Sequence, residues 1–212
     1  KDRKNSKIKD LKADVIVGAD GPYSAVAKAV SCERVKRVHS HVTGINSNSR
    51  MYLGMQAKVR LRMDTSSFET YFGSDFPNFF GWCVPESEDV ARLGVGCFEN
   101  AQEYFYRFLK NRTGKKEVLC WESGLIPLHN PKKLIQQDNV YLIGDAAAQV
   151  KATTGGGIVL GMLAGNECAK AIHEHLVSKR PLEIYNTFLG GIRKELELHW
   201  KIHQYQSQMS NT

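Results

Sequence analysis

The sequence predicts a mixed α/β (α+β) fold, in which a nucleotide-binding type of domain is interrupted by an antiparallel sheet and followed by helices. Two short apolar runs, residues 15–17 and 140–143, each end in a glycine and aspartate turn and lead into a helical pattern. Between them, residues 52–63 alternate apolar and polar side chains, which is typical of a strand with one wet face. The pattern thus changes from a short apolar run to alternation and back again. This order predicts that the antiparallel sheet is inserted into the nucleotide-binding type of domain.

The domain organisation follows from the same patterns. We predict a nucleotide-binding portion from residues 1–41 and 132–180, an antiparallel sheet from 42–131 and a helical segment from 181–212. Within the sheet, turn residues separate further expected strands at 68–72, 79–84, 90–97 and 118–125, and a helix is expected at about 101–109. In the last segment, apolar residues recur at helical spacing from Ile184 to Trp200.

Composition narrows the class of protein. The 212 residues carry a net charge of +7, and six Lys or Arg residues against two Asp gather within residues 1–12. No aromatic RNA-binding motif or helix-turn-helix pattern accompanies them, so we expect no nucleic-acid partner. These basic residues are then expected to form either a solvated edge or a peripheral contact with a membrane. The five cysteines are scattered without a CxxC, which indicates reduced thiols and a cytoplasmic location. No apolar run reaches the roughly 18 residues that a membrane span needs.

Residues 139–171 form the stretch around which the chain is organised. Gly144 lets the chain turn after the apolar run, and Asp145 places a carboxylate at the end of the expected strand. Three glycines precede a helical pattern that begins at Ile158, and free amides at a helix start attract negative charge. Small residues at helical spacing allow close approach to a sheet or a ligand: Gly157, Gly161, Ala164, Gly165 and Cys168. A turn without a ligand is the alternative interpretation.

A second turn and an aromatic strand add to this pattern. Asp20 and Gly21 follow the first apolar run, which we predict to be a buried strand, and Pro22 can set the entry to a helix at about residues 24–30. In the inserted sheet, Phe80, Trp82 and Val84 alternate and so share one strand face, and Pro85 is expected to end the pairing. That face is either part of a core or part of a substrate site.

These residues carry a family resemblance. The runs Gly144-Asp145-Ala146-Ala147 and Lys151-x-Thr153-Thr154-Gly155-Gly156-Gly157-Ile158 resemble the second flavin-binding motif of the geranylgeranyl reductases, which are FAD enzymes of the p-hydroxybenzoate-hydroxylase-like group. The Asp20-Gly21 turn resembles the Asp-Gly motif of the same group. Their N-terminal Gly-x-Gly-x-x-Gly is absent here, so the chain resembles only the second part of the family, and we interpret it as a fragment.

The resemblance implies a Rossmann-like FAD-binding domain and a set of site residues. The residues expected at the cofactor are Asp20, Gly21, Gly144, Asp145, Gly155, Gly156, Gly157 and Ile158. The run at 77–85 resembles the substrate-domain pattern Pro-x-x-Tyr-x-Trp-x-Phe-Pro and the Trp-x-Trp-x-Ile-Pro run of flavin-dependent halogenases. The residues expected on the substrate side are Phe80, Trp82, Val84, Lys151, Thr153 and Thr154. Full FAD binding is expected to need the N-terminal region.

The implied chemistry is reduction of carbon–carbon double bonds in a polyprenyl lipid. A reduced flavin would give a hydride to one alkene carbon while a proton reaches the other, with a nicotinamide cofactor or a ferredoxin as the electron donor. No residue is identified as the proton donor, and Phe80 lacks the hydroxyl that the family pattern has there. His199 and His203 lie four apart without a third ligand, so no metal site is expected. A flavin monooxygenase or halogenase, or a non-catalytic flavoprotein remnant, is the alternative.

Overall fold

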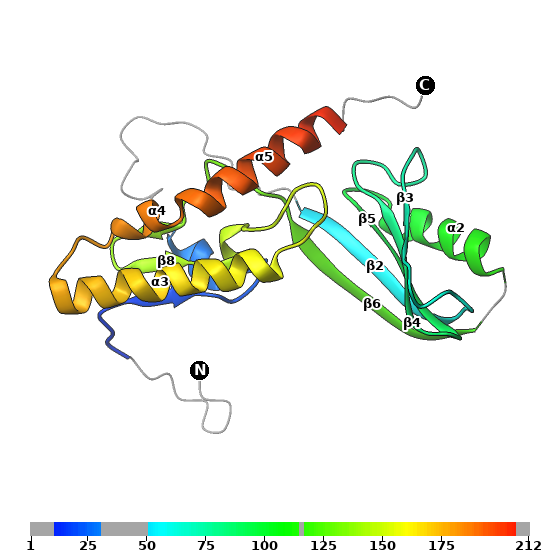
Figure 1. Ribbon diagram of the computed structural model, residues 1–212, viewed down its shortest axis with the longest axis horizontal. Helices are drawn as coiled ribbons and strands as arrows, with labels where there is room; N and C mark the ends of the chain where they lie inside the picture. The colour runs from blue at the N-terminus through cyan, green and yellow to red at the C-terminus, as the bar shows by residue number, and fades with distance from the viewer. Residues whose placement is uncertain (1–10, 31–50, 115–116, 207–212) are drawn as a thin grey trace.

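The computed structural model describes residues 11–30, 51–114 and 117–206. Figure 1 shows two parts side by side. One contains a small sheet with the C-terminal helices along it, and the other contains a twisted antiparallel sheet with a helix packed against it. The long strands β2 (Met51–Arg60) and β6 (Val118–Pro127) run from the junction of the two parts along the second sheet.

The small sheet has three strands in the order β1-β8-β7. β1 and β8 pair in parallel with Ile16 opposite Val140, which confirms the prediction that the two motif-bearing segments are neighbours. The helices α3 and α5 and the short helix α4 pack on this sheet around Tyr141, Leu160 and Tyr185. The bounds are β1 Ile16–Gly18, β7 Gln136–Gln137, β8 Val140–Leu142, η1 Gly144–Ala147, α3 Ile158–Ser178, α4 Ile184–Phe188 and α5 Gly190–Gln206.

The first strand differs from its prediction. Residues 15–17 were expected to be buried, but Ile16 and Val17 are 45% and 40% exposed, so this prediction is wrong. The reason is that β8 is the only partner of β1 among the described strands, which leaves β1 at an edge of the sheet. A helix begins at residue 25, within the predicted range.

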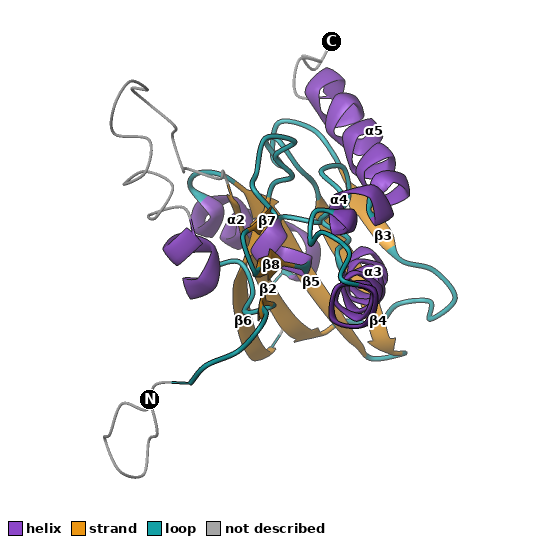
Figure 2. Cartoon of the chain, turned by 90° about the vertical axis from the view of Figure 1, so that its left-hand side faces the viewer, coloured by secondary structure: helices purple, strands orange, loops and turns teal. Residues whose placement is uncertain are grey.

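The antiparallel sheet has the strand order β3-β4-β5-β2-β6. Residues 52–63 were predicted to form a strand with one apolar face, and β2 confirms this as far as Arg60: Ala57 and Val59 are buried against Phe105 and Phe108 of α2. The bounds are β2 Met51–Arg60, β3 Glu69–Tyr71, β4 Gly81–Ser87, β5 Val90–Cys97, α2 Ala101–Thr113 and β6 Val118–Pro127. In Figure 2, which views the molecule from the end that carries the first part, α3, α4 and α5 lie in front of this sheet.

Strand β2 buries opposite faces at its two ends. Its second half faces α2, whereas Tyr52, only 1% exposed, belongs to a separate cluster with Leu128 and Ala152. Trp200 of α5 packs against this cluster. The first residues of β2 therefore connect the two parts of the molecule, which an alternating pattern alone does not predict.

Pro85 does not end the pairing of β4, so that prediction is wrong as well. Pro85 lies inside β4 and is opposite Ala91 of β5. On the other side of β4, the pairing with β3 reaches only Cys83. The missing amide hydrogen of proline is thus tolerated, because at this point β4 has a neighbour on one side only.

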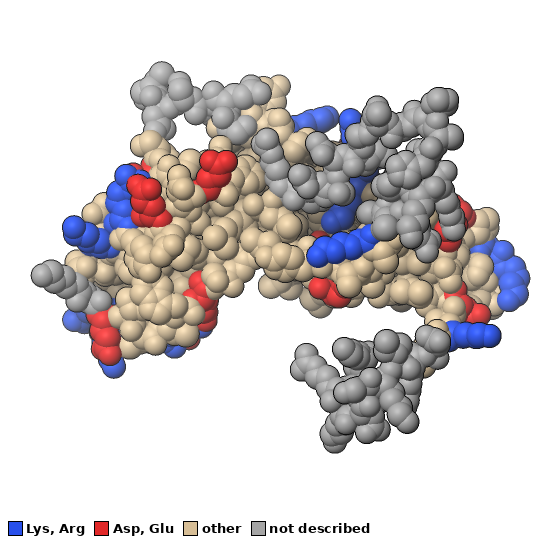
Figure 3. Space-filling model, turned by 180° about the vertical axis from the view of Figure 1, so that it is seen from behind, with Lys and Arg blue, Asp and Glu red and all other residues tan. Residues whose placement is uncertain are grey.

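The remaining predictions have mixed outcomes. Helices α4 and α5 confirm the helical C-terminal segment, and the four described cysteines are free thiols. None of the described helices is long and apolar enough to cross a bilayer. Figure 3 shows acidic and basic side chains interspersed on one face of the molecule. The domain boundaries 1–41 with 132–180, 42–131 and 181–212 stay predictions.

Candidate functional site

The two predicted motif turns lie at the same edge of the small sheet. Gly18 and Leu142 are register partners at the carboxyl ends of two parallel strands, and the amide of Ile143 donates to the carbonyl of Gly18 at 3.0 Å. The turn at Asp20-Gly21 follows the first strand, and the turn at Gly144-Asp145 follows the second. Such an edge is where ligands bind in open α/β sheets.

Asp145 offers a carboxylate at this edge. It lies in the 3₁₀ turn η1, and Gly144 before it has a φ of 60°, which favours glycine. Burial raises the pKa of Asp145, while the positive charge of Lys133 acts in the opposite direction. Within the described parts of the chain, no hydrogen bond reaches the carboxylate oxygens of Asp145. The side chain is therefore available to a ligand hydroxyl.

Gln149 holds this turn and was not predicted as a site residue. Its side chain is buried, and its Oε1 accepts a hydrogen bond from the amide of Gly144 at 2.7 Å. The backbone amide of Gln149 in turn donates to the carbonyl of Gly144 at 3.0 Å. A buried glutamine next to a polar loop carries no sequence signal for this role.

Asp20 has a structural task of its own. Its carboxylate accepts hydrogen bonds from Ser24 Oγ at 2.5 Å and from the amide of Ala25 at 2.7 Å, so it caps the helix that starts at residue 25. The hydrogen bond from Ser24 is the main reason why the pKa of Asp20 is lowered. Gly21 turns with a φ of 79°. Cofactor binding by Asp20 and Gly21 stays a prediction.

The glycine loop at 151–157 is closed by the backbone of Lys151. The Lys151 amide donates to the carbonyl of Gly156 at 3.1 Å, and its carbonyl accepts from the amide of Gly155 at 2.8 Å. Gly155 has a φ of 69°, in the left-handed region. A Cβ on Gly157 would lie 3.2 Å from Asp145 Oδ1, so the loop and the acidic turn are in direct proximity.

Helix α3 begins open to solvent. No described side chain caps its first turn, and Ile158 is 82% exposed. Farther along the helix, a Cβ on Gly161 would lie 3.3 Å from the Cα of Gly144. The small-residue stripe thus brings the helix against the motif turn, as expected. Its first amides remain free to bind a negatively charged group.

Two of the residues expected on the substrate side have partners on α5. Lys151 Nζ lies 2.5 Å from Glu195 Oε1, and Thr153 Oγ1 lies 2.6 Å from His199 Nδ1. Thr154 is exposed and accepts a hydrogen bond from the amide of Gly156 at 3.3 Å. Substrate binding by Lys151, Thr153 and Thr154 stays a prediction, and the contacts with α5 were not foreseen.

The aromatic strand presents its predicted face away from α2. Phe80 and Trp82 pack together with ring centroids 5.8 Å apart, and Trp82 donates from Nε1 to Gln56 Oε1 at 2.8 Å. A Cβ on Gly94 would overlap the Trp82 indole, so the ring lies directly on the backbone of β5. Val84 is 40% exposed and lies farther along the strand.

A row of glycines crosses the sheet next to these rings and is only partly covered by side chains. Gly54 is the register partner of Gly96 on one side and of Gly124 on the other. Phe79 covers the first of the row, because a Cβ on Gly96 would lie 2.5 Å from its ring, whereas a Cβ on Gly124 would meet nothing within 4 Å. The row is therefore open at Gly124 and covered by Phe79 and Ile126 beside it.

Phe79, and not Phe80, makes the contact with the glycine loop. A Cβ on Gly155 would lie 3.1 Å from Phe79 Cζ and 3.4 Å from Ile126 Cγ2. Phe79 stacks on Tyr52 at 4.6 Å and packs on Phe80 at 4.3 Å between ring centroids. The order from the loop outward is thus Phe79, Phe80 and Trp82. Sequence reasoning missed Phe79, although it stands beside Phe80 in the run it singled out.

Known proteins are similar to this chain in sequence or in fold. The protein named digeranylgeranylglycerophospholipid reductase 1 from Methanothermobacter thermautotrophicus is 30% identical over 96% of this chain and 52% of its own length. A geranylgeranyl bacteriochlorophyll reductase-like protein from Thermoplasma acidophilum has a TM-score of 0.78 at 22% identity, covering 97% of this chain and 53% of that one. The flavin-dependent halogenase CmlS has a TM-score of 0.66 at 11% identity, covering 95% and 41%. No family model matches the chain.

The fold and the paired motif turns define the class: a Rossmann-like architecture with an antiparallel sheet, which the reductase-like protein and the flavin-dependent halogenase share. The sequence relatives specify it further. The chain belongs to the geranylgeranyl reductase family, and the resemblance drawn from the motifs is confirmed. It spans about half the length of the curated relatives it matches.

Proposed function

We propose that this chain forms the second part of an FAD-dependent reductase that saturates carbon–carbon double bonds in the polyprenyl chains of a lipid. The relative from Methanothermobacter thermautotrophicus, named for the reduction of a digeranylgeranylglycerophospholipid, supports the substrate class. The fold alone does not distinguish this activity from halogenation, because a halogenase shares it.

The contact between Gly155 and Phe79 carries the proposal. It joins the loop at the start of α3 to the aromatic face of the antiparallel sheet, so a group bound at the loop has an apolar wall beside it. An isolated alkene has no polar handle, and its reduction therefore depends on being held close to the reductant in the correct orientation. An aromatic wall next to a nucleotide-type site meets that need.

The residues at the loop fit a flavin. The free amides of Gly157 and Ile158 at the start of α3 suit a group that becomes anionic, and Asp145 suits a chain of hydroxyl groups. Glycine at position 157 keeps the loop packed against the acidic turn, because a side chain there would meet Asp145 and Val150. When bound, reduced FAD would supply the hydride for the alkene. The residues present here would bind its ribityl chain and stabilise negative charge on its ring.

The antiparallel sheet provides the other wall. Phe80 and Trp82 are rigid and apolar, and they would hold a prenyl chain and keep water away from it. Farther from the loop, the same face becomes charged: Arg92 pairs with Glu122 at 2.7 Å, and Lys58 pairs with Glu86 at 2.9 Å. This polar end is a suitable boundary for an apolar substrate. Val84 lies at that boundary.

The proposed partners follow from the reaction. The reduced cofactor must be regenerated, and we expect a nicotinamide cofactor or a ferredoxin to supply the electrons. Because the substrate is a lipid, we expect a cytoplasmic protein with peripheral contact to a membrane. The relatives are about twice as long as the matched region, and we expect full FAD binding to need a region with the Gly-x-Gly-x-x-Gly motif.

One preparation tests the function. The protein, expressed from its complete gene, should be yellow with a flavin spectrum. With dithionite as reductant and without oxygen, it should add two hydrogen atoms per double bond to a digeranylgeranyl lipid, as measured by mass spectrometry. In a parallel assay with oxygen, oxygen consumption that depends on the lipid, with no saturated product in either assay, would instead identify a monooxygenase or halogenase. A colourless protein that cannot be loaded with FAD would identify a non-catalytic remnant.

A further inference from the structure

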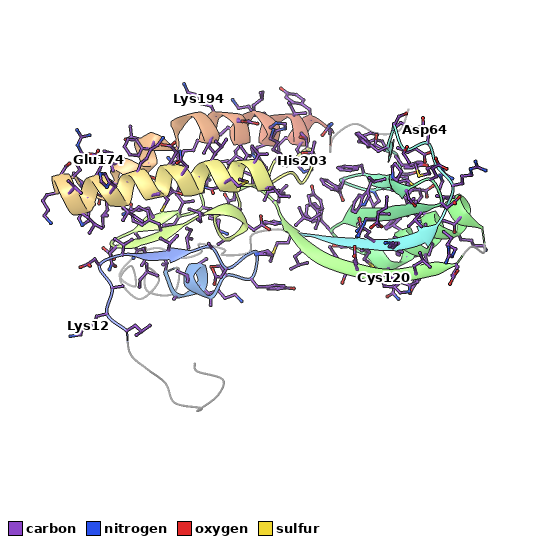
Figure 4. The ribbon with its side chains drawn as sticks, turned by 60° about the horizontal axis from the view of Figure 1, so that its bottom comes forward. Lys12, Asp64, Cys120, Glu174, Lys194 and His203 are labelled. Atoms are coloured by element: carbon purple, nitrogen blue, oxygen red, sulfur yellow. The ribbon has the colours of Figure 1, made fainter. Side chains whose placement is uncertain are left out.

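One face of α5 carries three polar side chains, each four residues from the next: Glu195, His199 and His203. Such spacing places them in a line along the helix. Glu195 makes an ion pair with Lys151, and His199 makes a hydrogen bond with Thr153. His203 lies at the end of the line, buried, with Nε2 3.0 Å from the hydroxyl of Tyr52. Figure 4 shows His203 on the part of α5 nearest the antiparallel sheet, and Lys194 on the outward side of the helix.

The first two contacts hold the glycine loop from outside. Lys151 closes the loop through its backbone: its amide donates a hydrogen bond to the carbonyl of Gly156, and its carbonyl accepts one from the amide of Gly155. Its side chain is partly buried and makes an ion pair with a carboxylate that is 43% exposed, so solvent weakens the pair without removing it. The hydroxyl of Thr153 is fixed two residues farther on. Together these anchors determine where Gly155 meets the sheet.

The third contact, between His203 and Tyr52, holds the aromatic cluster of the antiparallel sheet. Tyr52 lies between Phe79 and Phe98, with ring centroids 4.6 Å and 4.2 Å away, and its hydroxyl donates to the carbonyl of Asn78 at 3.1 Å. His203 therefore binds the ring on which Phe79 stacks. The same helix thus binds the loop on one side of the Gly155–Phe79 contact and the aromatic cluster on the other.

We propose that Glu195, His199 and His203 are positioning residues, which set the distance and angle between the glycine loop and the aromatic face. The inference rests on the proposed function, in which these two walls hold the flavin and the alkene. An alkene reacts only in a narrow range of positions over the reductant, so a small shift of the loop lowers turnover more than it lowers affinity. None of the three side chains needs to touch the substrate.

An exchange of charges tests the first anchor. Lys151→Glu and Glu195→Lys should each lower kcat for lipid reduction about tenfold or more with little change in KM, and should make the midpoint potential of the bound flavin more negative, because the loop amides are displaced from the ring. The double variant, which restores an ion pair, should recover most of both losses. Lys194→Glu is the matched control on the outward side of α5 and should change neither.

A second pair of variants tests His199. Thr153→Val removes the hydroxyl and should lower kcat, whereas Thr153→Ser retains it and should keep most of the rate. The proposal is overturned if the single charge variants lose turnover only in proportion to their folded fraction, or if the double variant recovers nothing, as expected when Lys151 binds substrate directly. If the wild-type protein binds flavin but reduces no lipid, the proposed function fails. The midpoint potentials of the wild type, the two single charge variants and the double variant then still decide whether α5 positions the loop.

Discussion

Replacing Trp82 with alanine should separate a substrate wall from a structural core. Trp82 is partly buried on the sheet face opposite α2. Its indole lies over Gly94 and donates a hydrogen bond to Gln56. Truncation should expose about 100 Å² of apolar surface, which at about 25 cal/mol per Å² corresponds to a loss of about 2.5 kcal/mol in the free energy of unfolding. This is below the roughly 3–5 kcal/mol expected for a tryptophan in a closed core.

The loss of activity should be larger than that loss of stability explains. Without the indole wall, a prenyl chain is misplaced over the flavin, and we expect lipid reduction to fall roughly a hundredfold. Reduction of an artificial electron acceptor, which needs no wall, should stay near the wild-type rate. The measurement pairs urea unfolding with both assays on the purified variant.

Trp121 provides the matched control. It lies on the same sheet, is 50% exposed, and packs on Phe105 and Tyr106 of α2 with ring centroids 5.7 Å apart in both cases. Trp121→Ala should cost about 2 kcal/mol of stability and leave lipid reduction of the folded protein unchanged. If both variants lose lipid and acceptor activity in proportion to their folded fractions, Trp82 is a core residue and the argument for the aromatic wall is refuted.

Three further predictions follow from named contacts. Asp145→Ala should weaken flavin retention by about 1.5–3 kcal/mol, roughly ten- to a hundredfold in Kd, measured as flavin content after gel filtration; undiminished flavin would reduce Asp145 to a turn residue. Gly165→Ala should raise the free energy of unfolding by about 0.5–1 kcal/mol, because the added Cβ would meet only a methyl carbon at 3.8 Å. Gly161→Ala should not, because its Cβ would lie 3.3 Å from backbone, and equal melting temperatures of the two variants would contradict this. Burial lowers the pKa of His129 and His203, so the folded state disfavours a proton that unfolded imidazoles accept near pH 6.5. The free energy of unfolding should thus hold above about pH 6.5 and fall below it, with a flatter slope in His129→Gln.

Local patterns in the sequence predicted much of the fold. Period-two alternation identified β2 because only one face of its second half packs on α2, and the spacing of Phe105 and Phe108 identified that helix. The motif turn was predictable because Gly144 supplies a left-handed backbone that few other residues adopt. The close approach of α3 followed from small residues at Gly161 and its neighbours.

The features that sequence reasoning missed depend on partners far away in the chain. Tyr52 and His203 are 151 residues apart, and nothing near either one indicates their hydrogen bond. Tyr52 also breaks the simple inside–outside pattern of β2, because the strand passes from one core to another. Pro85 is tolerated inside β4 only because β3 is short, and this is a property of the neighbouring strand. The role of Phe79 likewise depends on where the glycine loop lies.

The most direct test of the central claim is an anaerobic single-turnover measurement. The protein, expressed from its complete gene and loaded with FAD, is reduced with one equivalent of dithionite and mixed with a digeranylgeranyl lipid, and the absorbance of oxidised flavin is followed together with the mass of the lipid. The account predicts that oxidised flavin reappears only when the unsaturated lipid is present, with one double bond saturated per flavin. Flavin that stays reduced with the lipid and reoxidises only when oxygen is admitted would contradict it.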